Sequence, residues 1–273
     1  MNFGKNINNK LTVIVPSFNE EKHIEECLKS VLWADEIVVV DSFSSDKTVE
    51  IAKKYTDRIL QHEYINSAEQ KNWAIPQAKY DWVFIIDCDE RVTTQLKNEI
   101  RELLKKGPVK DGYSIKRNNY LMGKNIKYSG WGRDYVVRLF RKDVGRYQKK
   151  RVHSEIYLEN VGELRGCLDH YTISSVTAWL TKINIYSSWK AEDKFEKGSR
   201  LSPVVQLFSR PIFRFFKDFV LRLGILDGWR GFLIASMASF SEIVMIAKVI
   251  QLNIGNDTTL LPERTGMKND LKS

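Results

Sequence analysis

The chain has 273 residues, of which 43% are hydrophobic and 28% charged, enough to bury the core of one large domain or two small ones. This composition excludes a disordered chain, a collagen-like repeat and a small disulfide scaffold. The net charge of +9 suits a partner that is nucleic acid, an anionic membrane or a phosphorylated substrate, and the total does not choose among them.

The charge is unevenly distributed along the chain. Residues 1–100 carry 12 basic and 17 acidic side chains, a net charge of −5, whereas residues 101–153 carry 16 and 4, a net charge of +12. This pattern indicates a local basic surface beside an acidic half, whereas a general polyanion binder would be basic throughout. We therefore expect no nucleic-acid partner.

The cysteines and the apolar segments indicate the cellular compartment of the protein. Cys27, Cys88 and Cys167 are far apart and lack metal-ligand spacing, which predicts free thiols in a reducing cytoplasm. The first ten residues are polar and do not resemble a secretory signal. The most apolar stretch, 231–247, is interrupted by Glu242, so we expect a buried or interfacial helix there and not a membrane span.

The first part of the chain alternates between apolar strands and helices. Strands are predicted at 11–15, 36–40, 58–60 and 82–86, and helices at about 24–32, 47–55, 67–75 and 94–104. Because the strands are continuously apolar, we expect helices on both faces of a mostly parallel sheet, which defines an α/β fold.

Beyond Gly107-Pro108 the pattern is shorter and more mixed. Strands are predicted at 112–116, 135–140 and 152–158, and helices resume near Ser174. Later residues form an apolar helical stripe with cations roughly opposite. Such a basic amphipathic segment either packs on the rest of the protein or lies in a membrane interface. The stripe consists of Phe208, Ile212, Phe215, Phe216, Phe219 and Leu223, and the cations are Arg210, Arg214 and Lys217.

Polar residues follow the predicted parallel strands. Asn19 and Glu20 follow the first, Asp41 the second, and Asp87 and Asp89 the fourth. In open parallel sheets, ligands bind beyond these carboxyl ends. Two carboxylates in one turn can hold Mg²⁺ or Mn²⁺, which in turn holds the phosphates of a nucleotide, although two solvated loop carboxylates are the simpler alternative.

The order of the motifs indicates a family. Four segments in sequence resemble the nucleotide-sugar-binding domain of family-2 glycosyltransferases, which have the GT-A fold, and the resemblance covers roughly residues 11–170. They are Pro16-Ser-Phe-Asn-Glu20, the stretch 40–48, Gln70-Lys-Asn72 and Asp87-Cys-Asp89. Further segments resemble the branch of lipopolysaccharide inner-core β-1,4-glucosyltransferases, although relatives with other acceptors share them. These are Gln70-Lys-Asn-Trp-Ala74, 81–91, Trp131-Gly-Arg-Asp134, 138–142 and Val152-His-Ser-Glu155.

The resemblance implies a Rossmann-like GT-A catalytic domain over 1–172 and a helical C-terminal extension over 173–273. Within the catalytic domain, 11–106 would bind the nucleotide sugar and 107–172 the acceptor. The side chains implied to contact the nucleotide sugar are Pro16, Asn19, Glu20, Asp41, Lys71 and Asp87, and those implied to bind the metal are Asp87 and Asp89. Lys71 has the alternative of a helix-surface lysine, and Asp46 is interpreted as a helix cap.

The resemblance also implies a catalytic base downstream of the metal motif, since inverting transfer must remove a proton from the acceptor hydroxyl. Asp134, four residues before Arg138-Leu139, matches the family position, although Arg133 replaces the usual Glu before it. Glu155 is the alternative base, and His170 is a further metal-ligand candidate. Candidates for contact with the acceptor or the diphosphate are Trp131, Arg138, His153 and Glu155.

The expected activity is metal-dependent, inverting transfer of a hexose, glucose from UDP-glucose, to a lipopolysaccharide inner-core acceptor of the lipid A–core type. The enzyme would sit on the inner face of the cytoplasmic membrane, held by the anionic lipid surface. A glycosyltransferase of capsule or another surface glycan is an alternative. Two further alternatives are a sugar nucleotidyltransferase and a basic membrane-binding protein. The Gly-rich triphosphate loop expected of a nucleotidyltransferase is missing from this sequence.

Overall fold

The computed structural model describes residues 9–148, 155–173, 175–198 and 202–255, which form two compact units. The first unit combines the chain up to Asn118 with Asp134–Thr172, and the second combines Asn119–Arg133 with the chain from Ile173 onward. The segment Asn119–Arg133 falls inside the predicted 107–172 part, yet it groups with the later helices.

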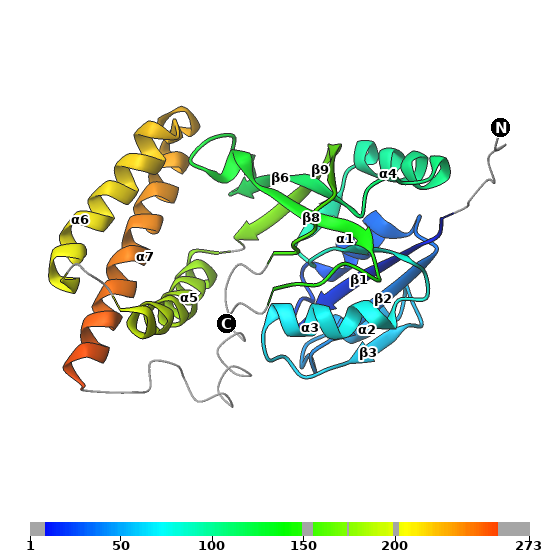
Figure 1. Ribbon diagram of the computed structural model, residues 1–273, viewed down its shortest axis with the longest axis horizontal. Coiled ribbons are helices and arrows are strands. Elements are labelled where there is room, and N and C mark those ends of the chain that lie inside the picture. The colour runs from blue at the N-terminus through cyan, green and yellow to red at the C-terminus, as the bar shows by residue number, and fades with distance from the viewer. Residues whose placement is uncertain (1–8, 149–154, 174, 199–201, 256–273) are drawn as a thin grey trace. The chain divides into compact units, whose positions relative to one another are not determined.

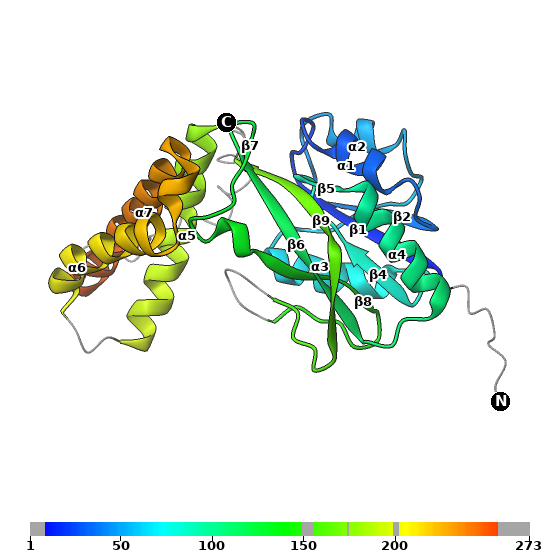
Figure 2. The ribbon, with the colours of Figure 1, turned by 90° about the horizontal axis from the view of Figure 1, so that it is seen from above.

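The first unit is built on a mixed sheet with the strand order β3-β2-β1-β4-β8-β6-β9-β5, and β7 pairs with β6 (Figures 1 and 2). Strands β3, β2, β1 and β4 are parallel, whereas β8 is antiparallel to both β4 and β6. The α/β class is therefore confirmed, and the parallel part is limited to these four strands. The strands are β1 (Leu11–Ser17), β2 (Glu36–Asp41), β3 (Ile59–Gln61), β4 (Trp82–Ile85), β5 (Glu90–Val92), β6 (Gly112–Leu121), β7 (Lys124–Asn125), β8 (Tyr135–Arg141) and β9 (Val161–Ile173).

Helices cover both faces of the parallel part. Helices α1 (Ile24–Val31) and α4 (Thr94–Lys106) lie on one face, and α3 (Ser67–Ala74) lies on the other (Figure 2). The short α2 (Thr48–Ala52) follows β2. Side-chain caps start two of these helices: Asn66 accepts a hydrogen bond from the third residue of α3, and Thr93 does the same for α4.

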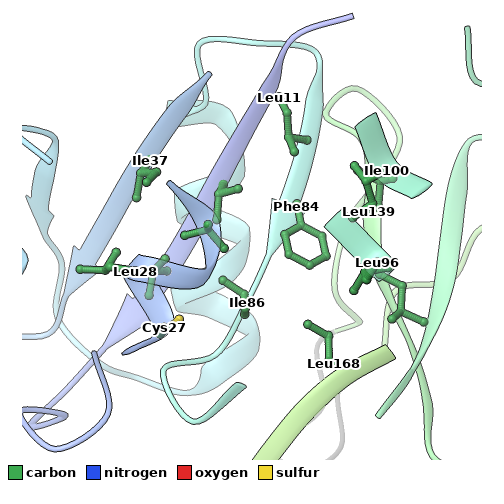
Figure 3. Close-up of a cluster of buried hydrophobic side chains, with 14 of the residues drawn as sticks. Leu11, Cys27, Leu28, Ile37, Phe84, Ile86, Leu96, Ile100, Leu139 and Leu168 are labelled. Carbon is green, nitrogen blue, oxygen red and sulfur yellow. The ribbon is translucent and has the colours of Figure 1, made fainter. Parts of the chain in front are cut away.

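The hydrophobic core lies on both sides of the sheet. In β1, Val13 and Val15 point to the cluster beneath α1 and α4, and Ile14 points to the cluster beneath α3. Phe84 of β4 is fully buried in the first cluster, close to Leu96 of α4 (Figure 3). Because neither face meets water, these strands are apolar at successive positions, as predicted.

The region after 141 differs from the predicted pattern. A strand was predicted at 152–158, but residues 152–154 lie outside the described residues, and Ile156 forms only an isolated bridge with Tyr147. The long strand β9 was not predicted. Its buried positions alternate, and Gly166 and His170 are among them beside Leu164 and Leu168, so its apolar signal is weak.

The second unit contains α5 (Val176–Lys197), α6 (Pro203–Phe216) and α7 (Trp229–Ile254). Helices α6 and α7 lie side by side (Figure 1), and α5 also packs on α7. A π-helical turn (Lys217–Leu221) and a 3₁₀ helix (Gly224–Asp227) connect α6 to α7.

Helix α7 is, in the described part of the chain, the one helix long and apolar enough to cross a membrane. The sequence led us to expect a shorter apolar stretch broken at Glu242. In the structure the helix continues through Glu242, whose carboxylate accepts a hydrogen bond from Arg210 at 3.0 Å. Helix α7 has the length and apolar composition of a membrane-spanning helix, and the core helix of a soluble protein can have the same length and composition.

Candidate active site

The carboxyl ends of β1 and β2 lie next to each other, with Ser17 paired to Asp41. The Asp41 side chain is fully buried. Its carboxylate accepts hydrogen bonds from the N–H of Ser44 at 2.9 Å and from the hydroxyl of Ser17 at 3.3 Å. Asp41 thereby fixes the start of the loop after β2.

Hydrogen bonds link the loop after β1 to the loop after β2. The Asn19 side-chain oxygen accepts the N–H of Ser45 at 2.9 Å, and the Asn19 N–H donates to the hydroxyl of Ser44 at 2.9 Å. The N–H of Glu20 donates to the Thr48 hydroxyl at 2.7 Å. Asn19 adopts a left-handed conformation with φ of +52°, a conformation that Asn tolerates better than most residues.

Asp46 serves both as a helix-start acceptor and as a link between the loops. Its carboxylate accepts the N–H of Thr48 at 3.0 Å and the N–H of Glu21 at 3.1 Å. The same loop carries Phe43, which sequence analysis did not single out. Phe43 is 51% exposed and has φ of +59°, so the loop presents an aromatic ring to solvent in an unfavourable backbone conformation.

Pro16 and Asp87 belong to neighbouring segments of this edge. Pro16 is buried in β1, and its carbonyl accepts a weak hydrogen bond from the Cys88 thiol at 3.4 Å. Asp87 follows β4, and its carboxylate contacts the Lys71 ammonium at 2.7 Å and the Arg138 guanidinium at 2.5 Å. Lys71 comes from α3 and is buried, which rules out the alternative of a solvated helix-surface lysine.

A second run of ion pairs continues from Arg138 to Asp134. Arg138 also contacts Glu90 at 2.6 Å, and Glu90 is fully buried. Glu90 contacts Arg117 at 3.4 Å, and Arg117 contacts Asp134 through two nitrogens, each 2.9 Å from a carboxylate oxygen. Six alternating charges thus form what we call the charge ladder: Lys71, Asp87, Arg138, Glu90, Arg117 and Asp134.

The ladder balances the cost of burying charges. Partial burial acts to raise the pKa of Asp87, but the positive charges of Arg138 and Lys71 outweigh it and hold that pKa well below its usual range. Burial likewise acts to lower the pKa of Arg138, and the carboxylates of Asp87 and Glu90 raise it above its usual range. Both groups are therefore ionised at neutral pH.

Asp89 lies beside a histidine. The Nε2 atom of His170 is 3.4 Å from a carboxylate oxygen of Asp89, and the N–H of Tyr171 donates to the Asp89 carbonyl at 2.8 Å. Pairing of β5 with β9 positions the two side chains, because Glu90 is the register partner of His170. Within the described residues no group of three or more His, Cys, Asp or Glu side chains forms a ready metal cluster.

The two candidate bases differ in their surroundings. Asp134 is held by Arg117, and its carbonyl accepts the Arg117 N–H at 2.8 Å. Glu155 is exposed, and its backbone carbonyl accepts the N–H of Gln148 at 3.0 Å. His153, the other candidate from that stretch, lies outside the described residues.

Trp131 belongs to the second unit. It begins a 3₁₀ helix (Trp131–Arg133), and its ring centroid is 6.0 Å from that of Trp179 on α5. Its carbonyl accepts a hydrogen bond from the Asn119 side chain at 2.8 Å. A Cβ at Gly132 would lie 1.7 Å from the Lys127 carbonyl oxygen, so this tight turn requires glycine. The indole is partly buried in an apolar cluster of the second unit.

Two members of the ladder were not identified as functional from the sequence. Glu90 was not among the candidate site residues, and the structure shows that it forms ion pairs with Arg138 and Arg117. Arg117 was not singled out at all. It is one of 16 basic residues in the basic sector, and only the pairing of β6 with β8 places it beside Asp134. No local motif marks such a position.

Comparison with known proteins identifies the family. The sequence profile described as "Glycosyl transferase family 2" matches residues 12–157, more than half of the chain. The chain therefore belongs to glycosyl transferase family 2: it is a glycosyltransferase, and its α/β unit has the GT-A fold. This membership decides against a sugar nucleotidyltransferase and against a binding protein without enzymatic activity.

Two glycosyltransferases from bacteria are similar to this chain over most of its length. The lipopolysaccharide core biosynthesis glycosyltransferase LpsC of Rhizobium meliloti (strain 1021) is 32% identical over 254 residues, which cover 88% of this chain and 92% of LpsC. An uncharacterized glycosyltransferase of Rickettsia typhi is 27% identical, covering 90% of this chain and 88% of the relative.

Two solved structures are similar to this chain at low sequence identity. Staphylococcus aureus TarS 1-349 in complex with UDP has a TM-score of 0.47 at 16% identity, covering 90% of this chain and 92% of TarS 1-349. Glucosyl-3-phosphoglycerate synthase of Mycobacterium tuberculosis, in complex with Mn²⁺ and UDP-glucose, has a TM-score of 0.35 at 21% identity and covers 41% of this chain and 44% of the synthase chain.

Proposed function

We propose that this glycosyltransferase is inverting and dependent on a divalent metal, and that it moves glucose from UDP-glucose onto a lipopolysaccharide inner-core or related glycolipid acceptor. The observation that carries the proposal is the charge ladder, which joins the Asp87-Cys-Asp89 turn to Asp134. Inverting transfer needs a site for the nucleotide diphosphate and a base for the acceptor hydroxyl, and the ladder has one candidate at each end. The similarity to LpsC supports the acceptor class.

The sheet edge is suited to a nucleoside diphosphate sugar. Buried Asp41 and the bonded loops that carry Asn19 and Glu20 would contact the base and ribose. Lys71 and Arg138 already bind the oxygens of Asp87, and diphosphate oxygens have the same charge and hydrogen-bonding character. The buried Nε atom of Arg138 has no hydrogen-bond partner among the described residues, which leaves a donor for a phosphate oxygen.

Asp89 and His170 are the side chains that would hold Mg²⁺ or Mn²⁺. One carboxylate and one imidazole leave coordination positions for substrate phosphates, an arrangement suited to these ions. The bound ion would neutralise charge on the departing diphosphate. The family resemblance also implied a metal-binding role for Asp87, but its oxygens contact two cations, and we assign to it the placement of Lys71 and Arg138.

Asp134 would act as the base. One carboxylate oxygen would accept the proton of the acceptor hydroxyl while that hydroxyl oxygen forms a bond to C1 of the sugar. The bond between C1 and the phosphate oxygen breaks, and its electron pair leaves with UDP, so the configuration at C1 inverts. We favour Asp134 over Glu155 because the ladder ties Asp134 to the residues of the donor site.

The second unit supports a position on the inner face of the cytoplasmic membrane. In α6 the buried residues are Gln206 and Pro211, and most of the apolar side chains are exposed, unlike those of a helix in a soluble core. Phe215 and Phe219 of the predicted stripe pack on Phe232 of α7. The exposed apolar residues of α6 are Val204, Val205, Phe208, Ile212, Phe213 and Phe216.

The function is tested with purified enzyme, Mn²⁺, UDP-glucose and heptose-terminated lipid A–core. Wild type should release UDP and add one hexose to the glycolipid, detected by mass. Asp134→Asn should lose about 10²–10⁴-fold in kcat while still binding UDP, because it lacks only the base. Asp89→Asn should instead lose Mn²⁺-dependent UDP binding.

The matched control is Asp143→Asn, an exposed aspartate paired with Arg141 in the same basic sector, which should keep wild-type turnover. Full activity of Asp89→Asn would contradict the metal assignment. Absence of hexose transfer to this acceptor, together with UDP release on another surface glycan, would contradict the acceptor class and support the capsule alternative.

A further inference from the structure

Arg117 is the one link between Asp134 and the rest of the charge ladder among the ion pairs of the described residues. It lies on β6, and its side chain is 20% exposed. Its Nε and one terminal nitrogen each donate to a different oxygen of Asp134, both at 2.9 Å. Such a two-point contact fixes both the position and the rotation of a carboxylate, which a single contact does not.

We propose that Arg117 is a positioning residue for catalysis: its guanidinium sets the orientation and the working pH range of Asp134, and Glu90 holds that guanidinium against the donor side of the site. This inference rests on the proposed role of Asp134 as the base.

The position of Glu90 explains why Arg117 is more than a surface partner of Asp134. Glu90 is fully buried, and a buried carboxylate must be compensated by charge or hydrogen bonds. Arg138 at 2.6 Å and the N–H of Asp87 at 3.1 Å supply part of this compensation. The third nitrogen of Arg117, 3.4 Å away, supplies the rest, so Arg117 is held from two sides.

The arrangement has two chemical consequences for a base. The positive charge of Arg117 favours the ionised form of Asp134, which keeps a proton acceptor available down to low pH. The two-point contact limits rotation about the Asp134 side chain, so that an oxygen stays aimed along one direction. Charged side chains near Asp134 among the described residues include Arg117 of β6 and the exposed Arg133 directly before it in sequence, and Glu90 of β5 and Arg138 of β8 lie behind Arg117.

Two substitutions separate charge from geometry. Arg117→Gln removes the positive charge, and we expect the acidic limb of kcat/KM against pH to move up by about one pH unit or more. Arg117→Lys keeps the positive charge but not the two-point guanidinium contact, so the acidic limb of the kcat/KM profile should stay within a few tenths of a pH unit of wild type. In both variants kcat should fall by about 10- to 100-fold, with KM for UDP-glucose changed less than about threefold.

The control is Arg133→Gln, which removes an exposed cation directly before Asp134 in sequence and should leave the profile unchanged. The assays use full-length enzyme, UDP-glucose and heptose-terminated lipid A–core, with UDP affinity measured by calorimetry. If the kcat/KM profile of Arg117→Gln against pH has the same acidic limb and the same plateau as wild type, the inference is overturned. A loss of UDP affinity equal to the loss of kcat/KM would also overturn it, since that result indicates a structural role in the donor site.

The Asp134→Asn variant distinguishes the two levels of the proposal. If Asp134→Asn retains wild-type turnover, the base assignment fails and the inference fails with it. If Asp134→Asn loses turnover while the Arg117→Gln profile matches wild type, only the role of Arg117 is wrong.

Discussion

At the scale of single residues, Glu90 is the buried centre of the site. It compensates two arginines, and no side-chain atom of it reaches solvent. Its neighbour in sequence, Asp89, has a different task because its carboxylate is partly exposed next to His170. Of these two adjacent acidic residues, Glu90 is buried among arginines, and Asp89 is the one whose carboxylate is exposed enough for the proposed metal-binding role.

Replacing Glu90 with Gln should destabilise the protein strongly. The variant removes a negative charge between Arg138 and Arg117, and breaking a buried ion pair in this way costs about 3–5 kcal/mol. The free energy of unfolding in urea is the measurement. The matched control, Glu50→Gln, changes an exposed glutamate of α2 and should stay within about 0.5 kcal/mol of wild type. A Glu90→Gln variant as stable as the control would show that the ladder contributes little to folding.

From the sequence, Asp41, Asp87 and Asp89 were predicted as site residues, and the family resemblance added Lys71, Arg138 and Asp134, but Arg117 and Glu90 were not predicted. Asp41, Asp87 and Asp89 were predictable because each follows an apolar run, and parallel strands bring their carboxyl ends to one edge. Arg117 was not predictable because its partner is chosen by strand register. Lys116 pairs with Tyr135, which sets Arg117 beside Asp134, and a shift of one residue would have turned the side chain to the other face.

At the scale of elements, the loops after β1 and β2 behave as one structure because each donates to the other. Asp46 contributes twice, to Thr48 at the start of α2 and to Glu21 across the gap. We therefore expect the nucleotide side of the proposed site to depend on Asp46, which the sequence analysis interpreted only as a helix cap.

Asp46→Ala should loosen both loops. Loss of two charge-assisted hydrogen bonds to backbone N–H groups should lower the free energy of unfolding by about 1–3 kcal/mol. UDP affinity should fall at the same time, because Asp46 holds Glu21, the residue after Glu20, and Thr48, whose hydroxyl accepts the Glu20 N–H. Thermal unfolding and calorimetric titration with UDP measure the two effects. Unchanged UDP affinity in a destabilised variant would separate the loops from nucleotide binding.

Strand prediction succeeded for the continuously apolar strands and failed for β9, in which only alternate positions are buried. Strands β1, β2 and β4 have continuous apolar runs because α1, α4 and α3 cover both sides. Strand β9 buries only alternate positions, so its sequence, with Arg165, Asp169 and His170 among its residues, does not stand out. The grouping of Asn119–Arg133 with distant helices was likewise invisible, because it depends on contacts with residues about a hundred positions away.

At the scale of the whole molecule, much of the exposed apolar surface falls on the chain after α5. The connection between α6 and α7 adds to the outward-facing residues of α6, with exposed large apolar side chains at Val220, Leu221, Leu223, Ile225, Leu226 and Trp229. Monomeric soluble proteins rarely leave so much apolar surface in contact with water. Two arginines of α6, Arg210 and Arg214, are each more than 40% exposed and suit anionic headgroups.

Membrane binding should therefore depend on α6 and on anionic lipid. The double variant Phe208→Glu with Ile212→Glu should weaken binding to phosphatidylglycerol vesicles at least about tenfold, since it removes two side chains worth about 1.5–3 kcal/mol each when buried. The control Val109→Glu places a charge at an 82% exposed site of the first unit and should bind like wild type. Vesicle co-sedimentation measures the affinity.

Extraction with alkaline carbonate distinguishes a peripheral enzyme from an integral one. Release from membranes is expected for binding through α6. Retention in the membrane would instead indicate that α7 spans it and would contradict the peripheral position proposed above. Wild-type affinity of the double variant would contradict a role of α6.

Asp227 should control the order of the segment that precedes Asp134. Its carboxylate accepts the N–H groups of Lys127 at 3.1 Å and Tyr128 at 2.9 Å. In Asp227→Ala both donors lose their partner, so amide hydrogen exchange over 119–133 should accelerate, with kcat reduced and UDP affinity retained. The control Glu196→Ala, at an exposed position of α5, should not change the exchange. Slow exchange at Lys127 and Tyr128 in Asp227→Ala would contradict this role.

The long separation between Asp227 and its partners also affects synthesis of the protein. Lys127 leaves the ribosome 100 residues before Asp227, a delay of roughly 5–20 s at typical bacterial elongation rates. During that time the segment next to the proposed base has no carboxylate to order it. A nascent chain is thus expected to complete the parallel strands and their loops first and to order the segment 119–133 only after α6 and the connection that carries Asp227 have been made.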